Sequence, residues 1–87
     1  MMIKATNAET AMAERDWTAD VKGMLRAEMT RRHLSYREMV EKLAAINVSE
    51  TEANLRNKIS RGGFTAVFFV QCLIAMGANT IRLHEPD

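Results

Sequence analysis

Residues 49–63, SETEANLRNKISRGG, decide the fold of this chain, because they read as a short helix with two different sides. Drawn at about 100° per residue, Leu55 and Ile59 fall on one side, one turn apart. The other side carries two amides and two cations within roughly 100° of arc, namely Asn54, Asn57, Lys58 and Arg61. Such side chains suit phosphates and base edges. The stretch therefore predicts a small helical domain that displays a basic helix to DNA.

The residues that follow predict a buried support for this helix. Gly62 and Gly63 stop the helix, and Thr65 caps the next one, which runs through the apolar residues 64–76 and ends at Gly77. Because that run is apolar all round, we expect it to be buried.

The residues that precede it predict a second capped helix. Ser35 and Glu38 have capping-box spacing, and Asn47 suits a left-handed helix end. The buried stripe is expected to be Met39, Val40, Leu43 and Ala44. Ser49 and Glu52 repeat the capping-box spacing and are expected to start the basic helix. Two short capped helices with a tight break between them form a helix-turn-helix pattern.

The ends of the chain complete the predicted organisation. Residues 1–15 read as a flexible arm, and Asp16 caps a first helix that runs to about Arg32. Its inward stripe is expected to be Trp17, Val21, Met24, Leu25, Glu28 (stem only) and Met29. The helix-turn-helix domain then spans residues 16–78, and the tail, 79–87, contains a weak strand pattern at 79–83. The fold class is all-α, with four or five helices.

Composition narrows the class of protein. The chain has 87 residues, 47% hydrophobic and 26% charged, which is ordinary globular composition for one small domain. A core of that size is marginal, so we expect a dimer. The single Cys72 excludes an intramolecular disulfide and a cysteine-based zinc site, and its apolar surroundings predict a buried side chain. No run approaches the ~20 apolar residues of a membrane span, and we expect a cytoplasmic protein.

Charge distribution is more informative than the net charge of +1. Residues 53–84 hold four cations, Arg56, Lys58, Arg61 and Arg82, and no acid. Arg56 points away from the amide-bearing side, nearer Leu55 and Ile59. Ser35, Tyr36 and Arg37 open the second helix, whose amino end suits phosphate. Ser35 also acts as the cap, and Tyr36 equally suits the edge of the core.

Nothing in the sequence supports catalysis or a bound cofactor. His33 and His84 have no partner at metal-ligand spacing, and the serines lack a neighbouring base. We therefore expect no metal, no cofactor and no enzymatic activity.

Residues 34–79, about half the chain, resemble the lambda-repressor-like (Xre/Cro-type) helix-turn-helix domains of bacteria and phages. The matching features are Leu34-Ser35, the Met39-Val40 pair, the run from Leu55 to Arg61-Gly62, and Ala75-Met76-Gly77. The resemblance implies phosphate contacts by Ser35, Tyr36 and Arg37, groove contacts by Thr51, Asn54, Asn57 and Lys58, and a place for Arg61 near the DNA backbone. The turn at 45–50 is longer than in that family. The run NLRNKISRGGF also resembles a conserved, uncharacterised bacterial domain family.

These features predict a dimeric, sequence-specific duplex-DNA binder, a transcriptional regulator of a bacterium or phage. The alternative is a protein-interaction module, antitoxin-like or an adaptor, that keeps the helices without reading DNA. In that case Phe64, Phe68 and Phe69 or the tail strand would meet a protein partner.

Overall fold

The computed structural model describes residues 15–81 and Leu83, which form four helices. These are α2 (Trp17–Arg31), α3 (Tyr36–Ala45), α4 (Glu52–Arg61) and α5 (Ala66–Met76). The described residues contain no strand, so the all-α class is confirmed. The strand expected at 79–83 is absent from the described part of that range, where it has no partner to pair with. The arm expected at 1–15, apart from Arg15, lies outside the described residues.

Each helix begins at a side chain that caps it. The side-chain oxygens of Asp16, Ser35, Thr51 and Thr65 accept a hydrogen bond from the backbone N–H three residues on, at 3.0–3.1 Å. The predicted capping box of Ser35 and Glu38 is confirmed, as is the predicted cap at Thr65. Each such bond satisfies a backbone donor that the helix itself leaves free.

The predicted start of the third helix at Ser49 is wrong. Thr51 caps α4 through the N–H of Asn54, at 3.1 Å, and the helix begins at Glu52. Ser49 and Thr51 both offer a capping hydroxyl, and tertiary contacts decide between them, because Glu50 between them turns inward to meet Lys58.

The capping assignment gives a direct stability prediction. Thr51→Ala removes the bond to Asn54 and is expected to lower the free energy of unfolding by about 1 kcal/mol. Ser49→Ala removes an exposed hydroxyl that caps nothing and should change it by less than about 0.5 kcal/mol. Urea unfolding of the two variants beside the wild type measures both. Equal losses, or a larger loss for Ser49→Ala, would contradict the assignment.

Three helices share one kind of ending, in which a left-handed residue turns the chain back: His33 (φ 56°) after α2, Asn47 (φ 66°) after α3 and Gly77 (φ 78°) after α5. In each, the next N–H returns 2.9 Å to a carbonyl five residues earlier. The expected roles of Asn47 and Gly77 as helix ends are therefore confirmed.

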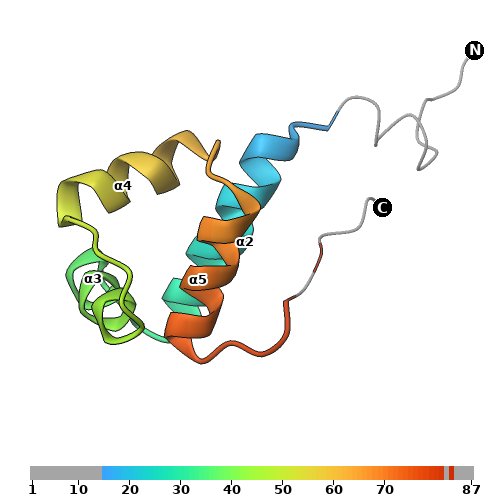
Figure 1. Ribbon diagram of the computed structural model, residues 1–87. Helices are drawn as coiled ribbons and strands as arrows, with labels where there is room; N and C mark the ends of the chain where they lie inside the picture. The colour runs from blue at the N-terminus through green and yellow to red at the C-terminus, as the bar shows by residue number, and fades with distance from the viewer. Residues whose placement is uncertain (1–14, 82, 84–87) are drawn as a thin grey trace, which may run out of the picture.

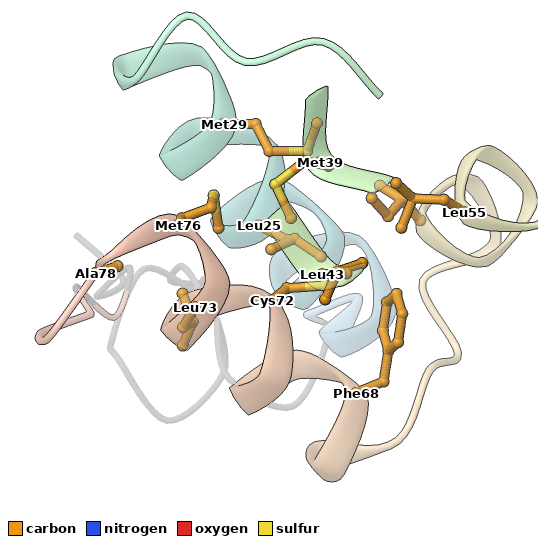
Figure 2. Close-up of a cluster of buried hydrophobic side chains, with 11 residues drawn as sticks. Leu25, Met29, Met39, Leu43, Leu55, Phe68, Cys72, Leu73, Met76 and Ala78 are labelled. Atoms are coloured by element: carbon orange, nitrogen blue, oxygen red, sulfur yellow. The ribbon is translucent and has the colours of Figure 1, made fainter. Parts of the chain in front are cut away.

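The helices pack around one core (Figures 1 and 2). α5 contacts α2 and α3, while α4 contacts α2 and α3 from a different side. Every helix contributes buried side chains: Leu25, Met29, Met39, Leu43, Leu55, Ile59, Phe68, Cys72, Leu73 and Met76. Residues 46–51 join α3 to α4, so their conformation sets the orientation of α4 relative to α3.

Several predicted core positions are exposed instead. Trp17 is 53% exposed, because the buried residues of α2 begin only at Leu25. Ala44 is exposed, since it lies about 100° around α3 from Leu43. The expected burial of residues 64–76 is confirmed on one side only, because α5 packs on α2 and α3 along that side and exposes the other. An apolar composition indicates burial but does not show which face is buried.

Glu28 buries its carboxylate as well as its stem, contrary to the prediction. Its side chain is 7% exposed and forms ion pairs with Arg32 and with Arg31, the latter at 2.6 Å. Burial raises the pKa of the Glu28 carboxyl, but the hydrogen bonds from Arg32 and Arg31 outweigh it and hold that pKa below its usual value. The two arginines therefore keep the Glu28 carboxylate ionised although it lies beside the core.

Gly62, which ends α4, lies tightly against Thr18 of α2. It adopts a left-handed conformation, with φ 72°, and its N–H bonds to the Lys58 carbonyl at 3.1 Å. A Cβ at this position would lie 2.8 Å from Thr18 Cγ2 and 2.9 Å from the Thr18 carbonyl oxygen. Only glycine fits both the conformation and the contact.

Candidate nucleic-acid interface

The outer side of α4 carries the side chains that the sequence singles out. Leu55 and Ile59 are fully buried, and Asn54, Asn57 and Arg61 on the opposite side are exposed. Within residues 15–81 and Leu83, the two asparagine amides bond to no other side chain and Arg61 has no ion pair. These donors and acceptors are therefore available to a ligand.

Lys58 is less free than its sequence position suggests. Its ammonium pairs with Glu50, whose side chain is only 8% exposed, and lies 4.8 Å from the centre of the Phe68 ring. Although residues 53–84 contain no acid, Glu50 just before α4 supplies the counter-charge. Lys58 therefore sits at the edge of the exposed side, where α4 meets the first turn of α5.

Arg56 lies on the opposite flank from Lys58 and connects α4 to α3. Its guanidinium pairs with Glu52 at 3.1 Å and lies 5.1 Å from the centre of the Tyr36 ring. Tyr36 is half-buried and packs against the core. This contact places the amino end of α3 beside α4, so that the two elements share one side of the molecule (Figure 1).

The amino end of α3 holds the other predicted contacts. The Ser35 N–H donates to Glu38 Oε1 at 2.9 Å, and the Ser35 hydroxyl lies 3.1 Å from the same oxygen. These bonds hold the pKa of the Glu38 carboxyl below its usual value, and the backbone N–H of Ser35 makes the larger contribution. Ser35 is thus occupied as a cap, while Arg37 is exposed and has no ion pair with the described residues. Arg37 is the side chain here that can reach a ligand freely.

Two cations of α2 also join this side, which sequence reasoning missed. The Lys22 ammonium donates to the Ser60 carbonyl at 3.0 Å, and Arg26 Nη2 lies 3.4 Å from Ser60 Oγ. Arg26 and Arg56 line the same shallow hollow, together with Ser35 and Tyr36. The i, i+4 spacing of Lys22 and Arg26 puts both on one face of α2, but nothing local shows that α4 lies against that face.

We call Lys22, Arg26, Arg37, Arg56 and Arg61 the basic face. Lys22, Arg26 and Arg56 lie along the flank of α4 that carries Ser60 and meets Tyr36, while Arg61 is exposed on the outer side of α4 and Arg37 at the amino end of α3. Thr51, Asn54 and Asn57 are exposed on α4 or at its cap and add neutral hydrogen-bonding groups. The arrangement combines fixed cations with amides, which suits an extended anionic partner.

Cys72 and His33, two further titratable residues considered in the sequence, are not part of the basic face. Cys72 is buried, as predicted, and burial raises the pKa of its thiol to about 12. The thiol therefore stays protonated at neutral pH. His33 is exposed at the end of α2, whereas His84 and Arg82 lie outside the described residues.

The helices are short relative to the thickness of a bilayer. No single helix in residues 15–81 is long and apolar enough to cross a membrane. Only α4 and α5 taken together reach that length and composition, and a bend of 119° separates them.

The fold and the basic face together define a small all-α domain with an exposed cationic surface. The chain belongs to a family described as Domain of unknown function (DUF6471), whose model matches residues 17–81. The match covers all four described helices. The expected resemblance to a conserved uncharacterised domain is thereby confirmed. Comparison with curated proteins and with solved structures gives no match.

Proposed function

We propose that this protein binds duplex DNA through the basic face. α4 enters the major groove, where Asn54 and Asn57 meet base edges, and the cations flanking it hold the phosphates on either side. The observation that carries the proposal is the contact of Arg56 with Tyr36, which places the amino end of α3 beside one flank of α4. Under this proposal α4 acts as the recognition helix and the amino end of α3 contacts the neighbouring backbone, as in helix-turn-helix proteins.

The predicted contact residues divide into three roles under this proposal. Asn54, Asn57 and Thr51 read the bases, since their exposed side chains are neutral hydrogen-bonding groups on α4 or at its cap. Arg37 and Arg61 bind phosphate, joined by the Lys22 and Arg26 pair from α2. Ser35 and Tyr36 position the end of α3, and Lys58 exchanges Glu50 for phosphate when DNA arrives.

The biological role that fits best is a transcriptional regulator of the lambda-repressor-like type, in a bacterium or phage. Its support is the sequence resemblance over residues 34–79 together with the all-α fold.

The test is the salt dependence of binding to a labelled random-sequence duplex, followed by fluorescence anisotropy. With about five phosphate contacts on each protomer and a slope of about −0.9 for each, the affinity of one bound protomer should fall by a few hundred-fold between 50 and 200 mM salt. A flat response, or no binding at 50 mM salt, would contradict the proposal.

A protein-interaction module is the second candidate, but on a different surface from the predicted one. Phe68 is only 6% exposed, and Phe64 stacks on Phe69 with ring centres 5.9 Å apart, so these aromatic rings largely cover one another. The exposed apolar side chains that favour a protein contact lie on α5 instead: Val67, Val70 and Ile74. If salt-dependent DNA binding fails, this candidate gains support.

A further inference from the structure

α5 turns three branched apolar side chains away from the core. Val67, Val70 and Ile74 are 67%, 52% and 59% exposed, respectively. They follow one another at spacings of three and four residues, so they form one stripe along the helix. Phe68 and Cys72, on the other side of α5, are buried. We call these three exposed residues the α5 stripe.

The spacing of the α5 stripe is that of a helix-helix seam. Apolar positions that alternate by three and four residues form the narrow contact line of paired helices, whereas helices that pack on a broad core need a wider face. Valine and isoleucine have few side-chain rotamers, so ordering them in a contact costs little conformational entropy. The stripe is therefore suited to a second helix.

The absence of charged residues from α5 indicates which helix packs against the α5 stripe. The sequence of α5, AVFFVQCLIAM, contains no charged residue, so its stripe can face its own copy without repulsion. The basic face, by contrast, would repel a second copy of itself. A charged protein partner would find no complementary group along the stripe.

We propose that the α5 stripe is a homodimer interface, in which α5 packs against α5 of a second copy about a two-fold axis. The inference deepens the proposed function and rests on it for its purpose, since two copies present two α4 helices to one duplex. Phe68, which lies under Lys58 of α4, is roughly 130° around α5 from the centre of the stripe. The dimer therefore leaves the Lys58 edge of α4 open, and the α5 stripe contains no residue of the basic face.

The size of the stripe sets the expected strength of the dimer. Three side chains of this kind make an apolar patch of a few hundred Å², which is the size typical of contact sites. Stable interfaces bury roughly 800 Å² on each partner, so the remainder must come from less apolar neighbours. We therefore expect a dissociation constant on the order of micromolar.

The test is sedimentation velocity of the full chain without DNA, from about 1 to about 200 µM. The wild type should shift with concentration from the 9.8 kDa monomer to a species of twice that mass. Val70→Asp and, separately, Val70→Lys should remain monomeric throughout, because a charge at the centre of the stripe meets its own copy. Ile81→Asp is the matched control, since Ile81 is another exposed branched residue, outside α5, and should leave the dimer intact.

A mixture of the two variants distinguishes the α5 interface from any other dimer contact. At the two-fold axis Val70 faces its own counterpart, so an equimolar mixture of Val70→Asp and Val70→Lys should restore the dimer by pairing opposite charges. Circular dichroism should show unchanged helix in both, since Val70 is exposed. A wild type that is monomeric at 200 µM, a dimer that survives Val70→Asp, or a mixture that stays monomeric would each overturn the proposal.

The result of the sedimentation experiment does not depend on whether the protein binds DNA. Loss of the dimer in Val70→Asp with retained salt-dependent binding to random duplex supports both proposals. A wild-type dimer that binds no DNA removes the proposed function and leaves the interface standing, with a purpose other than DNA recognition.

Discussion

Replacing Gly62 by alanine should destabilise the fold by about 2–4 kcal/mol, made up of about 1–2 kcal/mol for the left-handed backbone and the rest for steric crowding. The crowding arises because a Cβ would lie 2.9 Å from the Thr18 carbonyl oxygen, which is backbone and cannot rotate away. α4 must then move from α2. For a domain of this size the melting temperature should drop by about 10–20 °C, measured by circular dichroism.

The other glycines separate the two contributions. Gly77 is also left-handed, with φ 78°, but a Cβ there would have no heavy atom within 4 Å, so Gly77→Ala should cost only the backbone strain. Gly63 has neither a positive φ nor a close neighbour, so Gly63→Ala should be nearly neutral. The order of destabilisation is therefore Gly62, then Gly77, then Gly63. A Gly62→Ala loss no larger than that of Gly77→Ala would show that α2 and α4 are not in close contact there.

The core was largely predictable because local periodicity reports it. Leu25, Leu43, Leu55 and Ile59 follow the helical spacing of their own segments, and all four are fully buried. The caps at Ser35 and Thr65 were predictable for the same reason, since each is a bond between residues three apart. Such features need no knowledge of which helices are neighbours.

Features that depend on tertiary contacts were not predictable from the sequence. The choice of Thr51 over Ser49 as the cap accompanies the inward turn of Glu50 towards Lys58. The place of Lys22 in the basic face depends on α4 lying across α2, and α5 is so uniformly apolar that its sequence does not distinguish its buried from its exposed side. Periodicity identifies a face only where polar residues contrast with it.

Removing two cations from the basic face should weaken DNA binding strongly while leaving the fold intact. Arg37→Ala/Arg61→Ala deletes two exposed guanidinium groups that have no ion pair with the described residues, so no buried partner is left uncompensated. If each contact releases about 0.9 counterion, affinity at 100 mM salt should fall about 60-fold per protomer, and the salt slope should decrease by about 1.8. Fluorescence anisotropy with a random duplex measures both quantities.

The matched control is Arg31→Ala/Lys42→Ala, which removes the same amount of charge from outside the basic face. Arg31 lies five residues beyond Arg26, and Lys42 five beyond Arg37, so each is about 140° around its helix from that member of the basic face. Glu28 loses its ion pair with Arg31 in this variant but keeps the one with Arg32, so its buried carboxylate still has a cationic partner. The net charge of the protein changes its attraction to DNA wherever the charge is removed, whereas direct phosphate contacts are lost only when residues of the basic face are replaced. Binding should therefore be nearly unchanged in the control, and equal losses in both double variants would mean that affinity depends on net charge and that the basic face has no special role.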